Sequence, residues 1–167
     1  VLATTLASLG CKDPADGGTV CGPVISARQR DRIEGFLTRA QDAGATFATG
    51  GTRGPQEKGF FLEPTLVVGV DNTFEIARQE VFGPVLVALP YDSEDQAVEI
   101  ANDSDFGLSG AVYGADVEHA QAIAHRLRTG TVGVNGGIWY GADVPFGGFK
   151  QSGVGREMGV AGFEEYT

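Results

Sequence analysis

The sequence is poor in the residues that anchor metals, disulfide frameworks or nucleic acids. It has two cysteines, two histidines and one methionine, and its 12 lysines and arginines are outnumbered by 22 aspartates and glutamates. The net charge of −10 argues against a nucleic-acid partner, because phosphate binding depends on a basic excess. No apolar run approaches the roughly 20 residues of a membrane span, and no pattern of a secretory signal peptide is found. We therefore expect a cytoplasmic protein without a membrane partner.

The cysteines, the histidines and the single methionine allow further predictions. Cys11 and Cys21 form no metal-binding or redox motif, and two free thiols are typical of a reducing compartment. The two histidines lie six residues apart on a predicted helix and point to different faces, so they predict no metal site. The chain starts at Val1 and its only methionine is Met158, which indicates a piece of a longer chain.

The remaining composition is that of an ordinary globular protein. Apolar residues make up 42% of the chain and charged residues 20%. A chain of 167 residues has the length of one domain and buries roughly 70% of the surface that its unfolded form exposes. We expect residues 1–167 to form a single domain.

Three helices are predicted from their N-terminal caps and apolar stripes. Ser26 with Gln29 forms a capping box, and so does Ser93 with Gln96. Asp116 caps the third helix. Their expected buried residues are Ile33, Phe36, Leu37 and Ala40 in the first helix, Ala97, Ile100 and Ala101 in the second, and Ala120, Ile123, Ala124 and Leu127 in the third. The first is expected to end at Gly44 and the third at Gly130.

Short apolar runs between these helices predict strands. They lie at residues 45–48, 65–70, 85–89, 108–113 and 131–134. Alternation of such strands with helices favours an α/β fold with an open, mainly parallel sheet flanked by helices. Ligands of these sheets bind beyond the carboxyl ends of the strands. Chain order puts residues 135–159 there.

Residues 135–159 combine frequent glycine with large aromatic rings. The rings are Trp139, Tyr140, Phe146 and Phe149. One interpretation is a long surface loop, and the other is a site wall whose aromatics line an apolar cavity. A phosphate cradle is disfavoured, because Met158 stands where the dinucleotide fingerprint needs its third glycine.

Two motifs resemble the NAD(P)-dependent aldehyde dehydrogenases. After Asn135, residues 145–153 read PFGGFKQSG and residues 155–157 read GRE, like the C-terminal active-site segment of that family. Residues 79–85 read QEVFGPV, like its glutamate–phenylalanine cofactor motif. The resemblance runs from about Asp13 to the last residue. It implies the catalytic-domain fold of an enzyme that oxidises an aldehyde to a carboxylic acid with NAD or NADP.

The resemblance also implies roles for individual residues. Glu80 accepts hydrogen bonds from the nicotinamide-ribose hydroxyls, a task that suits a carboxylate, and Phe82 packs against the nicotinamide side. From the residues alone, Glu80 is equally interpreted as a solvated charge. A glutamate at position 157 lies near the family's active site and helps to position water or relay protons, whereas the residues themselves allow an Arg156–Glu157 surface pair at the start of a final helix.

The substrate side rests on the aromatic residues of the same stretch. The family lines its substrate tunnel at positions that match Ile138, Trp139, Tyr140 and Phe146, a set that favours an apolar or aromatic aldehyde. Lys150, Ser152 and Arg156 fit either a turn-stabilising role or a ligand contact.

The family's cysteine nucleophile, base glutamate and nucleotide-binding domain match nothing in this chain. That mechanism passes through a cysteine thiohemiacetal and a thioester. We therefore expect the isolated chain to be inactive, and the full-length protein to combine this chain with the rest of the parent chain in a homo-oligomer. The alternative is a non-catalytic binding or scaffold module with the same fold.

Overall fold

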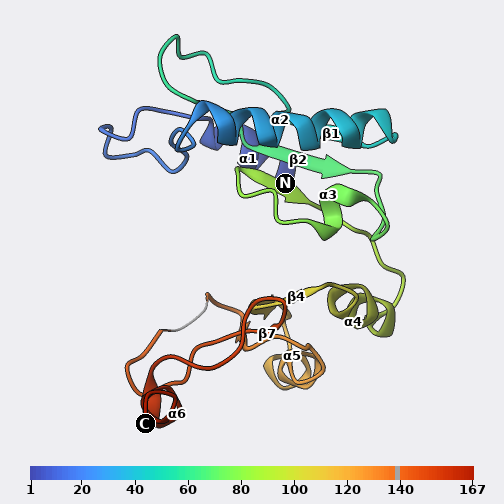
Figure 1. Ribbon diagram of the computed structural model, residues 1–167. Helices are drawn as coiled ribbons and strands as arrows, with labels where there is room; N and C mark the ends of the chain where they lie inside the picture. The colour runs from blue at the N-terminus through green and yellow to red at the C-terminus, as the bar shows by residue number, and fades with distance from the viewer. Residues whose placement is uncertain (138–139) are drawn as a thin grey trace. The chain divides into compact units, whose positions relative to one another are not determined.

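The computed structural model describes residues 1–137 and 140–167. Contacts within it group into two compact units, Val1–Pro90 and Tyr91–Thr167, and each unit is described by itself. Both combine helices with short strands (Figure 1), which confirms the predicted α/β class. That residues 1–167 form a single domain stays a prediction. No helix in the described ranges is long and apolar enough to cross a membrane.

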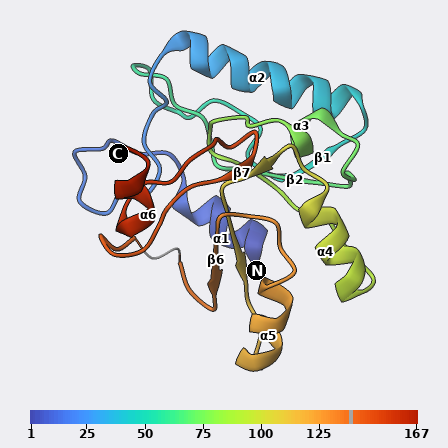
Figure 2. The same cartoon turned by 60° about the horizontal axis from the view of Figure 1, so that its bottom comes forward.

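The first unit is built on a three-stranded sheet. Its strands are β1 (Thr46–Thr49), β2 (Thr65–Val68) and β3 (Val85–Val87), in the order β1-β2-β3. β2 and β3 run parallel, as predicted, whereas β1 pairs with β2 in antiparallel fashion across a register shift. α1 (Leu2–Leu9) lies on one face of this sheet and α2 (Ala27–Asp42) on the other (Figure 2). The three predicted strands are thus present: β1 is displaced by one residue, and β2 and β3 are shorter than expected.

The core of the first unit lies between α2 and the sheet. All four residues of the predicted α2 stripe are buried, and Ile33 and Val67 are fully enclosed. Burial of an aliphatic side chain of this size contributes roughly 1.5–3 kcal/mol. The other members of this cluster are Ala45, Leu62, Val70, Ile76 and Val81. Periodic apolar residues on α2 therefore fix the helix against the sheet.

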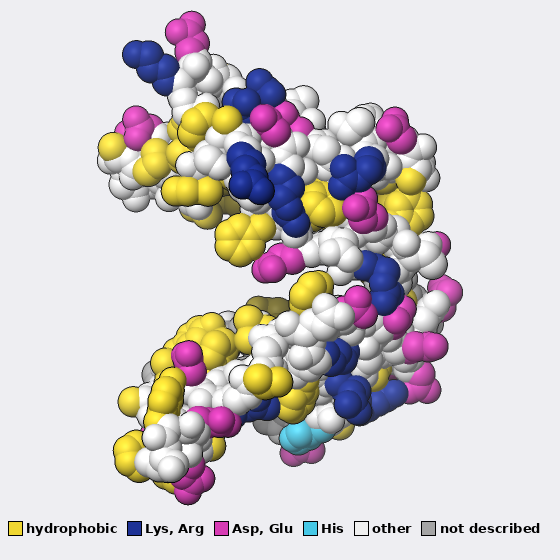
Figure 3. Space-filling view, viewed as in Figure 1, with side chains coloured by type: hydrophobic (Ala, Val, Ile, Leu, Met, Phe, Trp, Pro, Cys, Tyr) yellow, Lys and Arg dark blue, Asp and Glu magenta, His cyan; other side chains and the backbone are white. Residues whose placement is uncertain are grey.

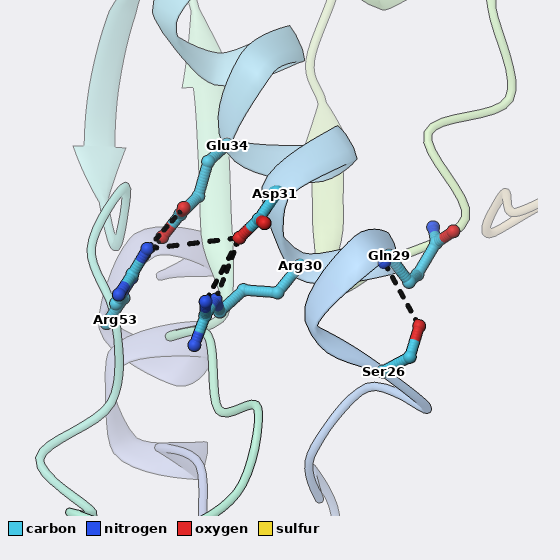
Figure 4. A network of polar contacts seen from close by, with 6 residues as sticks. All are labelled: Ser26, Gln29, Arg30, Asp31, Glu34 and Arg53. Atoms are coloured by element: carbon cyan, nitrogen blue, oxygen red, sulfur yellow. Dashed lines mark hydrogen bonds and ion pairs between the residues drawn. The ribbon is translucent and has the colours of Figure 1, made fainter.

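The start of α2 forms only half of the predicted capping box. The Ser26 Oγ accepts a hydrogen bond from the backbone N–H of Gln29 at 3.2 Å, as predicted (Figure 4). The Gln29 side chain does not return to the Ser26 backbone. It donates instead to the backbone carbonyls of residues 81 and 82. A tertiary contact has replaced a local one.

Ion pairs join the outer side of α2 to the loop that follows β1. Arg53 in that loop lies 2.5 Å from the carboxylate of Glu34 and 4.0 Å from that of Asp31 (Figure 4). Figure 3 shows acidic and basic side chains interspersed on the visible face of this unit. The Arg53 hydrogen bond lowers the pKa of Glu34. Exposed pairs of this kind contribute about 0–1 kcal/mol each.

The connector between β2 and β3 contains one helical turn. This turn is α3 (Glu75–Arg78). Gly44, with φ of +99°, follows the end of α2 in the left-handed region that glycine favours. Arg39 near that end pairs with Glu75 at 2.7 Å and so links α2 to α3.

The second unit consists of short elements around two small sheets. Its helices are α4 (Glu94–Asn102), α5 (Val117–Ala124) and α6 (Gly159–Glu164), and its strands are β4 (Phe106–Gly107), β5 (Ser109–Val112), β6 (Thr131–Val134) and β7 (Phe149–Lys150). β5 and β6 run parallel, in agreement with the prediction, and α5 packs against both. β4 and β7 pair in antiparallel fashion and were not predicted.

Two details of the second unit correct the sequence-based expectations. In α4 the buried residue is Val98, and the three predicted residues are only partly buried or exposed. In a helix of only nine residues, the apolar pattern alone does not determine which side faces the core. α5 ends at Ala124, well before Gly130, because the next turn closes with tighter bonds from the N–H groups of Arg126 and Leu127.

Candidate active-site segments

The motif at residues 79–84 forms a loop between α3 and β3. Val81 points into the core with 8% of its surface exposed. Its two neighbours point outward: Glu80 is exposed, and Phe82 keeps 70% of its surface accessible. Because Val81 is buried in the core, the Glu80 carboxylate and the Phe82 ring lie on the outer side of the loop.

The backbone of this loop is strained at Phe82. Phe82 adopts φ of +57°, a left-handed conformation that is rare for a bulky residue. Such conformations cost about 1–3 kcal/mol and persist only where surrounding contacts enforce them. At the next residue, Gly83, an added Cβ would collide with the Cδ1 of Ile33. The loop therefore needs glycine at position 83 to lie against the core.

Two side chains of α2 hold the loop by its carbonyl groups. The Nε2 of Gln29 donates to the carbonyls of Val81 at 3.3 Å and Phe82 at 2.9 Å. The guanidinium of Arg32 donates to the carbonyls of Glu80 at 2.8 Å and Val81 at 2.5 Å. Three consecutive carbonyls are thus bound by one helix, which fixes the direction of the Glu80 and Phe82 side chains.

Sequence reasoning missed both of these α2 residues. The sequence pattern assigns Gln29 only to a capping box and gives Arg32 no role. The available signal is their spacing: residues three apart lie on the same side of a helix. Their partner loop lies about 50 residues further along the chain, which no local pattern reveals.

In the second unit, Asn135 fastens the start of the glycine-rich segment. Asn135 follows β6 with φ of +51°, a conformation that asparagine tolerates better than most residues. Its Oδ1 accepts from the N–H of Gly114 at 2.8 Å, and its Nδ2 donates to the carbonyl of the same residue at 2.7 Å. The side chain thereby extends the β5–β6 pairing by one step.

Lys150 and Ser152 anchor the middle of the segment. The Lys150 Nζ donates to the carbonyl of Asn102 at 2.8 Å, at the end of α4, and to that of Ser104 at 2.9 Å, just after it. The Ser152 Oγ accepts from the N–H of Gly107 at 2.9 Å. Both contacts support the turn-stabilising role over a ligand contact.

Arg156 stabilises the same segment from its C-terminal side. Its Nη1 donates to the carbonyls of Gly148 at 3.0 Å and Gly155 at 2.7 Å. Its guanidinium lies 5.2 Å from the centre of the Phe149 ring, within range of a cation–π interaction. The described part of the segment is therefore held in place by contacts of its own side chains.

The predicted substrate-side aromatics are partly brought together. The rings of Tyr140 and Phe146 lie 4.8 Å apart at 51°, a tilted contact of the kind that aromatic pairs prefer. Tyr140 keeps 57% of its surface exposed, and Phe146 is half-buried. Ile138 and Trp139 lie outside the described residues.

Glu157 lies beside Phe146 and not in the final helix. The two residues exchange backbone hydrogen bonds of 2.8 Å each, in an isolated β-bridge. α6 begins only at Gly159, which corrects the expectation that residues 156 and 157 open that helix. The exposed Glu157 lines a pocket of about 410 Å³ in the second unit. Other residues that line this pocket include Leu108, Phe146, Arg156, Glu165 and Tyr166.

Neither thiol of the chain is suited to nucleophilic attack. Burial raises the pKa of Cys11 to about 11, and a hydrogen bond to Glu63 at 3.3 Å adds to the effect. Burial raises the pKa of Cys21 as well. Thiols with raised pKa values stay protonated near neutrality, and the thiolate is the reactive form. Across the described part of the chain, no cluster of His, Cys, Asp or Glu is arranged to hold a metal ion.

These features define an α/β protein with one loop that presents a carboxylate and a ring, and one glycine-rich aromatic segment. The profile of the Aldehyde dehydrogenase family matches residues 1–167. The chain therefore belongs to the aldehyde dehydrogenase family, as the two motifs indicated.

Individual relatives agree with this assignment. The chain is 44% identical to a geranial dehydrogenase of Castellaniella defragrans, over 99% of this chain and 34% of that protein. It is 42% identical to a betaine aldehyde dehydrogenase of Brucella melitensis, over 93% of this chain and 32% of that protein. The chain thus spans about a third of the length of the curated relatives it matches.

A solved structure shows the same backbone arrangement. The crystal structure of betaine aldehyde dehydrogenase from Staphylococcus aureus in complex with NAD+ matches with a TM-score of 0.94 and 41% identity. The match covers 99% of this chain and 33% of that one. This similarity confirms the predicted fold class.

Proposed function

We propose that the full-length enzyme carrying this chain oxidises an aldehyde to a carboxylic acid with NAD+ or NADP+. In this proposal the chain supplies contacts to the nicotinamide ribose and part of the substrate wall. The observation that carries it is the loop at residues 80–82, whose outward carboxylate and ring are fixed by α2. The NAD+ complex of the Staphylococcus aureus relative supports the choice of cofactor.

The chemistry of the loop fits a nicotinamide nucleotide. The two oxygens of the exposed Glu80 carboxylate can each accept a hydrogen bond, which matches the two hydroxyls of a ribose. Phe82 offers an exposed ring against which a flat heteroaromatic group can pack. Bound NAD(P)+ supplies the hydride acceptor of the reaction. Glu80 and Phe82 hold and orient it, and such orientation lowers the barrier to transfer.

On the substrate side, the proposal assigns the aromatic residues to the tunnel wall. The ring contact between Tyr140 and Phe146 supports this assignment, with Ile138 and Trp139 as further members. The relatives are named for two unlike aldehydes, geranial and betaine aldehyde, so family membership alone selects no substrate. An aromatic wall favours an apolar or aromatic aldehyde. Glu157, beside Phe146, is assigned to water positioning or proton relay.

The nucleophile is assigned to the rest of the parent chain. Cys11 and Cys21 have raised pKa values and lie in loops of the first unit, which argues against both. The cysteine would form a thiohemiacetal and then a thioester that water hydrolyses to the acid, and bound NAD(P)+, held by Glu80 and Phe82, would supply the hydride acceptor. A homo-oligomer of the full-length enzyme also belongs to this proposal.

The proposal is tested by comparing the full-length protein with residues 1–167 alone. Each is incubated with NAD+ or NADP+ and a panel of aliphatic, aromatic and cationic aldehydes, and reduced cofactor is followed by absorbance. We expect aldehyde-dependent reduction by the full-length protein and none by the isolated chain. A full-length protein that binds neither cofactor nor aldehyde would instead support a scaffold module.

A further inference from the structure

We infer that Arg32 is a positioning residue: it sets the loop at residues 80–82 in the conformation that receives the cofactor. This inference rests on the proposed function, since it assigns a purpose to the loop's rigidity. It adds a residue of α2 that touches neither reacting atom and acts through the backbone of Glu80 and Val81.

The hydrogen-bond geometry calls for a guanidinium. Two different nitrogens of Arg32 donate to two consecutive carbonyls, Nη2 to that of Glu80 and Nη1 to that of Val81. A planar group with donors in a fixed fork can bind both carbonyls at once, whereas an ammonium group acts as a single point charge. Arg32 therefore fixes the orientation of two peptide planes and not just the position of one atom.

The guanidinium is itself held in place by the core. It lies 4.7 Å from the centre of the Phe36 ring, and that ring is 7% exposed. A cation over an aromatic face contributes a modest attraction and restricts the side chain. Arg39 lies 4.9 Å from the same ring but binds Glu75 and not the loop. The two arginines thus share one aromatic partner and differ in what else they hold.

The strained residue next in the loop explains why such a clamp is needed. Phe82 keeps φ of +57° although the conformation is unfavourable, and its own carbonyl is bound by Gln29. Without Arg32, the carbonyl of Glu80 turns to water and that of Val81 keeps only the 3.3 Å bond from Gln29, so the strained backbone gains room to relax. Gln29 remains in place, so the loop loosens without unfolding. A loose loop must be ordered again on binding, and that cost weakens affinity.

The test uses the full-length enzyme with Arg32→Met and, as matched control, Arg39→Met. Both changes remove a guanidinium from the Phe36 ring, and only the first frees the loop. Amide hydrogen exchange of residues 79–84 is measured without cofactor, and NAD+ affinity by calorimetry. For Arg32→Met we expect faster exchange in that loop, about ten-fold weaker NAD+ binding and an unchanged KM for the aldehyde. The ten-fold figure corresponds to one charged hydrogen bond. Arg39→Met should leave loop exchange and NAD+ affinity unchanged.

Three further measurements separate the positioning role of Arg32 from the proposed function of the loop in cofactor binding. Arg32→Lys should lie between the wild type and Arg32→Met, because it retains a donor but not the fork. Weaker NAD+ binding with unchanged loop exchange would overturn the positioning role, since Arg32 would then act by direct contact. Glu80→Gln in the same titration separates the two claims. If it weakens NAD+ binding and Arg32→Met does not, only the inference fails; if neither does, the proposed function of the loop fails.

Discussion

The two candidate site segments are both held in a defined conformation, but by different contacts. The loop at residues 80–82 is short, and its carbonyls are bound by side chains of a helix about 50 residues earlier in the sequence. The segment at residues 135–157 is long and is stabilised chiefly by its own side chains, including Asn135, Lys150 and Arg156. Both segments contain non-glycine residues with positive φ.

This difference in contacts predicts which substitutions should disturb each segment. The short loop depends on a packed helix, so changes in α2 should reach it while its own sequence stays intact. The long segment depends on close backbone approaches at glycines and on several separate hydrogen bonds. We expect its structure to be most sensitive to added Cβ atoms and only partly sensitive to the loss of one bond.

The largest expected effect is on the long segment, from Gly130→Ala. An added Cβ would collide with the backbone carbonyl of Gly147, which no side-chain rotation can relieve. The segment must shift, and we expect the free energy of unfolding to fall by about 3 kcal/mol, the upper part of the range for overpacking. Urea denaturation of the full-length protein measures this. Gly137→Ala is the control, because no atom of the described residues lies within 4 Å of its Cβ position. Equal effects of the two changes would refute the close approach.

A smaller effect is expected in the short loop, from Gly83→Ala. Here the added Cβ meets the end of the Ile33 side chain, which can move in part. We expect a loss of about 1–2 kcal/mol in the free energy of unfolding. The double variant Gly83→Ala with Ile33→Val should lose less than the sum of the two single changes, since the smaller side chain makes room. Simple additivity in the same denaturation experiment would show that the two residues are not in conflict.

Asn135→Ala should cost less again. It removes both hydrogen bonds to Gly114 and places a residue that disfavours positive φ at +51°. We expect about 1 kcal/mol from the hydrogen bonds, with strain in addition. Asn135→Gly relieves the strain but not the loss of the bonds, so it should lie between Asn135→Ala and the wild type. An Asn135→Gly protein as stable as the wild type would mean that the side-chain bonds contribute nothing.

The smallest effect on stability at neutral pH comes from titration of the buried thiol of the first unit. The pKa of Cys11 is raised from 9.0 to about 11, so its contribution to stability is complete below pH 9 and is lost as the pH rises toward 11. Alkylation of Cys11 by iodoacetamide, followed by mass spectrometry, should be slow at neutral pH and rise steeply only above pH 9. Rapid alkylation at pH 7 would contradict the raised pKa and reopen Cys11 as a nucleophile.

The sequence predicted what is local and missed what is tertiary. The α2 stripe and the side-chain cap at Ser26 follow from periodicity and from one hydrogen bond three residues away, and both are confirmed. β4 and β7 are each two residues long and form only because segments distant in the sequence pair. No local sequence pattern predicts them. The strand β1 was predicted, but its antiparallel pairing with β2 was not, for the same reason.

The candidate site shows the same division. The motifs identified both segments, and the rings of Tyr140 and Phe146 are in contact, while their role in a substrate wall stays a prediction. The clamp formed by Gln29 and Arg32 depends on how α2 packs beside the loop, which spacing along the chain cannot reveal. The sequence allowed Lys150 either to stabilise a turn or to contact a ligand. Its hydrogen bonds to the carbonyls of Asn102 and Ser104 favour the first role.

The central claim is that the short loop presents Glu80 to the cofactor, and single-turnover hydride transfer in the full-length enzyme tests it most directly. Glu80→Gln removes the charge and keeps the shape, and Glu118→Gln, at an exposed position in the first turn of α5, is the matched control. Loss of a charged acceptor costs roughly 1.5–3 kcal/mol, so we predict hydride transfer about ten- to a hundred-fold slower for Glu80→Gln and unchanged for Glu118→Gln. Equal rates for Glu80→Gln and the wild type would contradict the account.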